Sequence, residues 1–171
     1  MPKISYIIVN IDQQRLYCID HNEKKISDYP VSTSHFGTGN QNGSFKTPLG
    51  MHRIVQKIGG GCAINEVFIG RQPTGVLEDL LAKNEKLPED IITSRILWLQ
   101  GQEPGLNKGK NNQDEIIDSY QRYIYIHGTS EEDKIGQPAS HGCVRMRNRD
   151  IIELFDLVNE GCPVLIREKE E

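Results

Sequence analysis

The residues with the clearest chemical potential lie in one segment, IYIHGTSEEDKIGQPASHGCVRM, at residues 124–146. It contains one cysteine, Cys143, and two histidines, His127 and His141. A thiol becomes a strong nucleophile only as thiolate, so it needs a base or an electropositive neighbour, and the two histidines can supply that setting. A glycine follows each histidine, which keeps the backbone open where amides must hold an oxyanion. The segment therefore predicts a cysteine-based acyl-transfer site.

The same side chains allow other functions. His127, His141 and Cys143 could ligate zinc, although a fourth ligand at His35 or His52 lacks the compact spacing of zinc sites. A zinc-dependent hydrolase thus stays an alternative, as does a module that binds its ligand without turnover. An activated cysteine–histidine pair favours an enzyme over a pure binder.

The other three cysteines have ordinary surroundings. Cys18 alternates with apolar residues in RLYCID, Cys62 lies in a glycine-rich loop, and Cys162 follows a predicted helix. Free, inert thiols are the default for such contexts in a cytosolic chain. We therefore expect no disulfides, and Cys143 as the one functional thiol.

Composition and charge narrow the class of protein. The chain has 171 residues, a pI near 5.8 and a net charge of −4, which fits a single domain over residues 1–171 and argues against a nucleic-acid partner. No apolar run is long enough to cross a bilayer, and the first residues do not resemble a signal peptide. We expect a cytoplasmic protein; a periplasmic one trimmed of its signal is the alternative.

The rest of the sequence predicts the elements that must position these residues. Short β-branched or alternating runs predict strands at residues 6–10, 16–20, 26–33, 51–57, 95–100, 122–127 and 164–166. An apolar stripe predicts a helix over 149–159, with Asn148 as N-cap, and a second short helix lies near 76–81. Residues 101–112 are rich in Gly, Asn and Lys and predict a surface loop. The fold class is mainly β with a small helical contribution.

The HGT…SHGCVRM pattern resembles the catalytic domain of YkuD-type L,D-transpeptidases. The segments TPLGMHRI (47–54) and RNRDIIELFDLVNEGCPVLI (147–166) resemble the same family, so the likeness spans residues 4–166 and is least specific at 70–112. It implies a YkuD-like β-sandwich, with no cofactor and no metal.

The resemblance also implies roles for individual residues. Cys143 is the nucleophile, His127 is the general base, and the Gly128 carbonyl orients the imidazole. The backbone amides of Gly142 and Cys143 are the oxyanion donors.

Three further residues of the motif are expected to bind substrate or shape its pocket. Arg145 would pair with a substrate carboxylate, because a guanidinium fork matches that group. Ser140 would hydrogen-bond within the loop, and His141 would help to shape the pocket.

The implied substrate is a muropeptide or a peptidoglycan stem tetrapeptide. Cys143 would attack the carbonyl of its L,D bond, expel the terminal D-Ala and hold an acyl-enzyme. With water as acceptor, the protein is a cytosolic L,D-carboxypeptidase of peptidoglycan recycling. With an amine as acceptor, it is a transpeptidase that crosslinks the wall or exchanges D-amino acids. Carbapenem-like β-lactams would acylate the same thiol.

Overall fold

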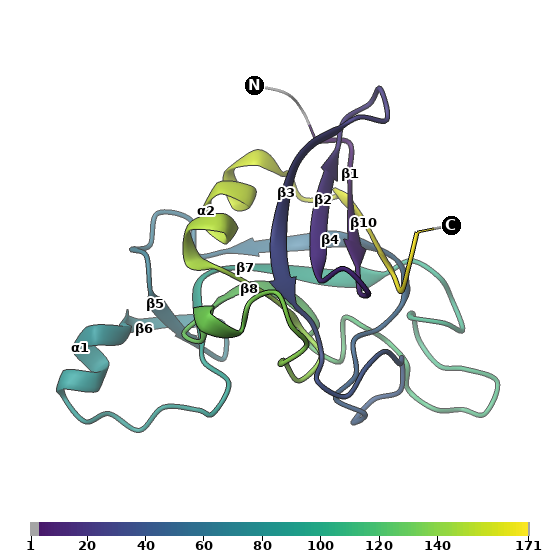
Figure 1. The fold of residues 1–171 in the computed structure, drawn as a ribbon. Coiled ribbons are helices and arrows are strands. Elements are labelled where there is room, and N and C mark those ends of the chain that lie inside the picture. The colour runs from purple at the N-terminus through teal and green to yellow at the C-terminus, as the bar shows by residue number, and fades with distance from the viewer. Residues whose placement is uncertain (1–3, 171) are drawn as a thin grey trace.

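One hydrogen-bonded sheet of ten strands dominates the structure, a computed structural model that describes residues 4–170 (Figure 1). The strands are β1 (Tyr6–Asn10), β2 (Arg15–Ile19), β3 (Lys25–Ser32), β4 (Gly50–Ile58), β5 (Glu66–Ile69), β6 (Gln72–Val76), β7 (Ile92–Gly101), β8 (Tyr125–Thr129), β9 (Val144–Met146) and β10 (Pro163–Arg167). The helices are α1 (Leu77–Ala82), the 3₁₀ helix η1 (Glu132–Lys134) and α2 (Asn148–Leu157).

Eight of the strands form a closed ring. The order runs β4-β10-β1-β2-β3-β9-β8-β7, and β4 also pairs with β7, so the ring has no free edge. Most neighbours are antiparallel, but β1 with β10 and β8 with β9 are parallel. Strands β5 and β6 extend the sheet beyond β7. Closure removes exposed backbone donors and acceptors that could otherwise pair with other chains.

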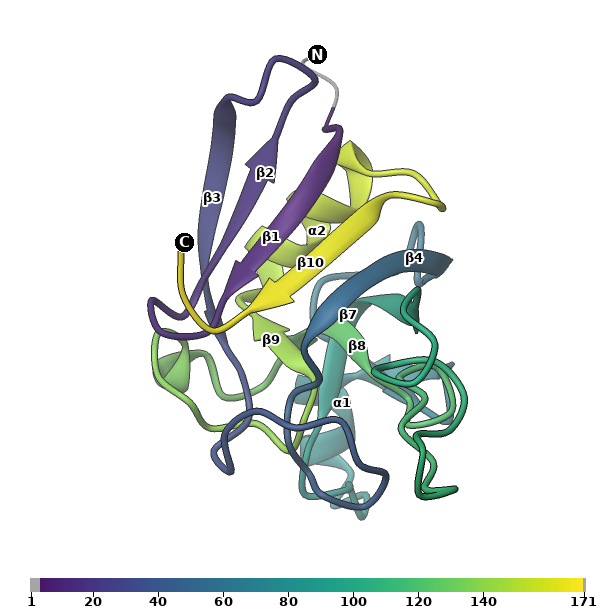
Figure 2. The ribbon, with the colours of Figure 1, turned by 90° about the vertical axis from the view of Figure 1, so that its right-hand side faces the viewer.

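The apolar core lies between the two halves of this ring. Figure 2 shows β1, β2, β3 and β10 side by side as one layer with α2 behind it, and Figure 1 shows β4 and β7 running across the direction of that layer. The helix α2 also packs against β7 and β8. The main cluster combines Ile7 and Leu16 of the first layer with Leu97 and Ile126 of the second, and Leu154 of α2 packs among them. Alternation along each strand supplies this inward face. The predicted mainly β fold with few helices is confirmed, and the sandwich is made from one continuous sheet.

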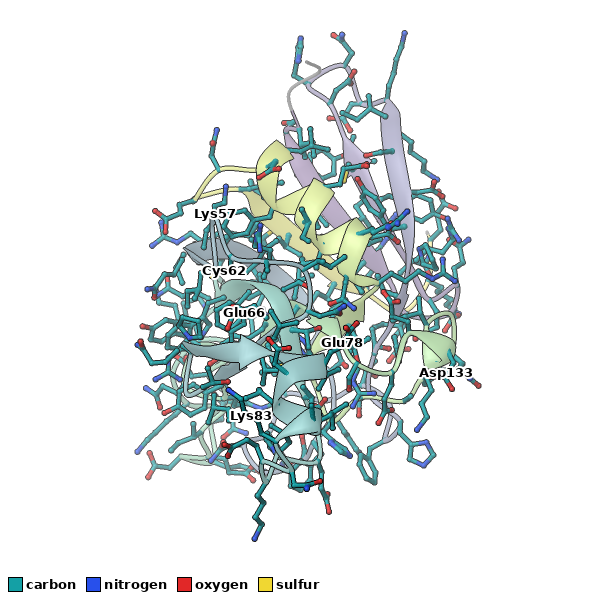
Figure 3. The ribbon with its side chains drawn as sticks, turned by 90° about the vertical axis from the view of Figure 1, so that its left-hand side faces the viewer. Lys57, Cys62, Glu66, Glu78, Lys83 and Asp133 are labelled. Atoms are coloured by element: carbon teal, nitrogen blue, oxygen red, sulfur yellow. The ribbon has the colours of Figure 1, made fainter. Side chains whose placement is uncertain are left out.

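Residues 66–82 form an excursion from the ring that overlaps the first part of the segment of weakest resemblance, 70–112. Strands β5 and β6 and the short helix α1 make it up, and Figure 3 views it from the side, with Glu66 and Glu78 labelled. The helix was predicted, but the hairpin was not. The loop that returns from α1 to β7 carries Asp90, which reaches the candidate site described below.

The predicted surface loop at 101–112 is anchored through buried polar groups. Asn107 is fully buried and its side-chain amide donates to the carbonyls of Leu49 and Met51. His52 of β4 is also fully buried, with its Nε2 2.8 Å from the Ser119 hydroxyl. Burial lowers the pKa of His52 to about 4, so it is neutral and structural.

Within residues 4–170, no helix is long and apolar enough to span a membrane.

The helix α2 begins differently from the expected cap. Arg147 occupies the N-cap position, and Asn148 is the first helical residue. The predicted cap at Asn148 was therefore wrong. Its side chain is buried and bonds to distant groups instead, accepting from the hydroxyls of Thr93 and Ser94 and donating to the Thr129 carbonyl.

Candidate active site

Two parallel strands bring the motif residues together. In the β8–β9 pair, Ile126 lies opposite Val144 and His127 opposite Arg145. Ile126 and Val144 both face the main core. Because side chains alternate along a strand, His127 and Arg145 share the other face. Cys143, directly before β9, packs on that face against a second cluster around Trp98.

His127 is fully buried, and only one of its ring nitrogens has a partner. Nδ1 lies 2.5 Å from the carbonyl oxygen of Gly128. A carbonyl can only accept, so Nδ1 carries the proton and Nε2 is a bare acceptor. Nε2 is buried without a hydrogen-bond partner. Buried polar atoms are rarely left unpaired, so a free imidazole lone pair here points to a proton-accepting role.

The Cys143 thiol is held between two backbone groups, one at the start of β8 and one in the turn before it. The Tyr125 amide donates to Sγ, and Sγ donates to the Tyr123 carbonyl, each over 3.3 Å. Burial of the sulfur, reinforced by the charge of Asp90, raises the pKa of Cys143 to about 12, despite the opposing effects of the Tyr125 amide and nearby arginines. Burial also lowers the pKa of His127.

The resting pair is therefore a neutral thiol and a neutral imidazole. Two histidines were expected to supply the activating setting of the thiol, with His127 as the base. His127 is desolvated and uncharged, and His141 points elsewhere. A buried thiol with a raised pKa needs a base to accept its proton, and the unpartnered Nε2 of His127 is an acceptor on the same strand face.

This ionisation state predicts the pH dependence of activity. The lowered pKa of His127 keeps it a free base below pH 6.5, its ordinary value, and activity is lost only when pH falls through that lowered pKa. The raised pKa of Cys143 places no thiol ionisation near neutrality. We expect kcat/KM to be level across neutral pH, with its acid limb below 6.5. An acid limb near pH 4 together with a basic limb near pH 8 would instead indicate a thiolate–imidazolium pair.

The turn before the nucleophile is fixed by one buried hydroxyl. Ser140 Oγ donates to the Cys143 carbonyl over 2.6 Å and accepts from the Gly142 amide over 3.2 Å. Gly142 has φ +128°, a conformation that favours glycine. Ser140 thus bonds within the loop, as expected, and is not presented to substrate. Its bond occupies the Gly142 amide, whereas the Cys143 amide has no acceptor among residues 4–170 and is the freer oxyanion donor.

Arg145 is placed differently from its expected role. Its side chain is 4% exposed and pairs with Asp90 over 2.8 Å and with Glu131 over 3.5 Å. A guanidinium that is buried and already neutralised by two carboxylates is not a vacant receptor for a substrate carboxylate. Arg145 instead fixes Asp90, and with it the loop between α1 and β7, beside the thiol.

His141 lines the same cavity as Cys143 and has no hydrogen bond to it among the described residues. Its side chain is 46% exposed, with Nδ1 3.8 Å from Asp90. Its ring lies 6.3 Å from the rings of both Phe36 and Phe45, two exposed aromatics. A cavity of about 350 Å³ lies between His141, Phe45, Asp90 and Cys143. Two more cavities, of about 350 and 250 Å³, also reach His141. The expected pocket-shaping position of His141 matches this geometry.

Gly128 has no room for a side chain. A Cβ there would lie 2.4 Å from the Thr93 carbonyl oxygen and 2.6 Å from Asn148 Oδ1. Because Gly128 has no side chain, its backbone packs directly against the hydrogen-bonded pair Thr93 and Asn148. This packing supports the Gly128 carbonyl that bonds to His127.

Gly128→Ala is therefore expected to destabilise the fold by about 1–3 kcal/mol, the usual cost of overpacking a rigid site. Urea unfolding measures this. Gly60→Ala is the matched control, because its Cβ would meet only the Phe155 ring at 3.5 Å. Equal stability of the two variants would contradict the packing argument.

Among residues 4–170, no three His, Cys, Asp or Glu side chains are grouped so as to hold a metal ion. The zinc alternative required His127, His141 and Cys143 to converge. His141 turns toward Asp90 and the two phenylalanines instead.

Two residues of the candidate site were not predicted from the sequence. Asp90 contacts Arg145 from 55 positions away, and Arg122 lines the Cys143 cavity. Arg122 was expected inside a strand over 122–127, but β8 starts only at Tyr125, and Tyr123 has φ +56°. No local signal marks either residue, since both positions depend on long-range contacts.

The fold and this Cys–His arrangement match one known family. The family model of the L,D-transpeptidase catalytic domain (YkuD) matches residues 4–166. The chain belongs to this family, and it is an L,D-transpeptidase-family enzyme.

Particular relatives bear out the match. The chain is 26% identical over 161 residues to YcfS of Escherichia coli K12, named a probable L,D-transpeptidase, covering 94% of this chain and 43% of YcfS. The structure of the C442S mutant of the Enterococcus faecium L,D-transpeptidase aligns with TM-score 0.54 at 14% identity, covering 97% of this chain and 50% of that one. The structure of the L,D-transpeptidase LdtMt1 in complex with imipenem aligns with TM-score 0.54 at 14% identity, covering 95% of this chain and 58% of that one. This chain spans less than half the length of the curated relatives it matches.

Proposed function

We propose that this protein cleaves the L,D bond next to the terminal D-Ala of a peptidoglycan stem tetrapeptide through an acyl-enzyme on Cys143. The observation that carries the proposal is the buried, unpartnered Nε2 of His127 on the same strand face as the thiol. Membership of the L,D-transpeptidase family supports the choice of substrate.

The first half-reaction follows from this geometry. Sγ attacks the carbonyl carbon while its proton passes to Nε2 of His127. The Cys143 amide stabilises the oxyanion. The C–N bond then breaks, His127 returns the proton to the departing amine, and D-Ala leaves. A thioester to Cys143 remains.

Water completes the proposed reaction. It attacks the thioester, gives a proton to His127, and releases the tripeptide as the thiol re-forms. The half-buried Cys143 lines a cavity whose rim carries Phe45, 59% exposed, so solvent has a route to the thioester. An L,D-carboxypeptidase of peptidoglycan recycling is the function we favour. A cytoplasmic location remains a proposal that cell fractionation would test.

Transpeptidation is the second candidate, and one observation favours it. The two additional cavities that reach His141 offer room for an amine acceptor. Phe36 and His141 line both, so an acceptor peptide would lie against an aromatic surface.

A defined tetrapeptide distinguishes the two acceptors. We expect mass spectrometry to show free D-Ala and accumulating tripeptide, with little dimer even at high substrate concentration, because water reaches the open thioester. A large excess of another D-amino acid should divert only a minor fraction into exchange product. Dominant dimer would establish the transpeptidase reading, and no D-Ala release from any tetrapeptide would refute both.

The thiol should also react with β-lactams. A matched structure is a complex with imipenem. We propose that carbapenem-like compounds acylate Cys143, because they present a strained carbonyl to the same nucleophile.

A further inference from the structure

Arg122 is held firmly at the edge of the Cys143 cavity. Its Nη2 donates to the Lys46 carbonyl over 2.6 Å and contacts the Ser44 hydroxyl at 3.4 Å, and its Nη1 donates to the Gly39 carbonyl over 3.3 Å. These three contacts fix the guanidinium against the loop between β3 and β4. A guanidinium has five N–H donors, so two remain for a ligand.

This cation has no acidic partner. Its three acceptors are neutral oxygens, and among residues 4–170 no carboxylate lies within 4.0 Å of it. Burial lowers the pKa of Arg122, which shows that the charge is partly desolvated. A carboxylate that binds beside a partly buried, unpaired positive charge stabilises that charge. Arg145, the arginine that the motif singled out, is already neutralised by Asp90 and Glu131.

The position of Arg122 selects which carboxylate it can reach. Both Arg122 and Cys143 line the same cavity. The next residue, Tyr123, accepts the thiol hydrogen bond at 3.3 Å, so Arg122 lies close to where the scissile carbonyl must sit. In a peptide ending in D-Ala, only the amide nitrogen and one carbon separate that carbonyl from the terminal carboxylate. Every other carboxylate of the stem lies farther along the peptide.

We infer that Arg122 binds the terminal carboxylate of the donor peptide and so makes the enzyme selective for a free D-amino-acid end. This inference rests on the proposed function, whose donor is that tetrapeptide. Arg122 then aligns the scissile bond over Cys143 with a charge-assisted contact from its remaining donors.

Two donors and two variants test the assignment. The donors are the tetrapeptide with a free D-Ala carboxylate and the same peptide ending in D-alaninamide. In the wild-type protein, amidation is expected to lower kcat/KM by about 10- to 100-fold, chiefly through KM, the scale of one charged hydrogen-bonded contact. In Arg122→Gln, cleavage of the acid donor should fall similarly, and amidation should then have almost no further effect. Arg122→Lys keeps the charge and should keep most of the sensitivity to amidation.

The other outcomes separate the possible failures. If Arg122→Gln slows both donors equally and the amidation penalty persists, the residue only anchors its loop and the inference is wrong. If Arg122→Gln instead abolishes a penalty from amidating the side-chain carboxylate of the third residue, the terminal assignment is wrong. If the wild-type protein cleaves neither donor, the proposed function itself fails. Circular dichroism and urea unfolding of each variant exclude loss of the fold as the cause.

Discussion

Cys143→Ala is expected to release no detectable D-Ala while remaining folded. Removing the nucleophile of a covalent mechanism costs about 10⁴-fold or more in kcat, because the remaining groups cannot form the acyl-enzyme. Only the sulfur is lost, and its two contacts are to backbone groups of Tyr123 and Tyr125. The fold should therefore survive. Time courses of D-Ala release by mass spectrometry measure the effect.

Cys62→Ala is the matched control for that variant. Cys62 is half-buried and lies on the face shown in Figure 3, together with Lys57 and Glu66. Its loss should leave turnover intact. A carbapenem should add one adduct to the intact mass of the wild-type protein and of Cys62→Ala, but none to Cys143→Ala. Appreciable turnover by Cys143→Ala would end the proposed mechanism.

His127→Ala is expected to lower kcat by at least about 100-fold, the usual contribution of a general base. Its free nitrogen is the proton acceptor of the first step, and no other imidazole can replace it. His141 is directed toward Asp90, and His52 bonds to Ser119. Steady-state kinetics on the tetrapeptide give the size of the effect.

Two measurements separate this chemical role from a structural one. His127 is fully buried, so its replacement by alanine leaves a cavity and lowers stability as well. Added imidazole should enter that cavity and restore part of the rate if the lost group is the base. His141→Ala, at an exposed position, should lose less than about 10-fold, because it does not take part in proton transfer. Equal losses for the two variants would contradict the assignment of the base.

Strands with a clear sequence pattern were predicted, and strands without such a pattern were missed. Residues 6–10 are a short β-branched run and form β1 as expected. The five residues of β6 include Pro73 and Gly75, which are typical of turns. Strand β9 has only three residues, too few to show a period. Asn148 has good capping chemistry, but its buried contacts with Thr93 and Ser94 replace the local cap.

The site was predictable where it is local and not where it depends on the fold. The HG and SHGC segments mark His127 and Cys143 in the sequence, and the pairing of β8 with β9 brings the two segments together. The ionisation of the thiol was not predictable, since desolvation depends on what packs around it. The sequence suggested Arg145 as a ligand for substrate, but Arg145 already forms an ion pair with Asp90. Asp90 lies in the loop between α1 and β7, and the sequence does not predict where that loop packs.

The closed ring has a consequence for how the molecule is made. Strand β10 is the last along the chain, yet it lies between β1 and β4, with Val164 paired to both Ile7 and His52. Until β10 has been synthesised, β1 and β4 lack the strand that pairs with both, so one edge of each stays unpaired. Such distant pairings make folding slow, on the order of milliseconds to seconds, and leave the open edges prone to aggregation. The β8–β9 pair, which carries His127, belongs to the same ring. A nascent chain should therefore complete its candidate site only once β10 has been inserted.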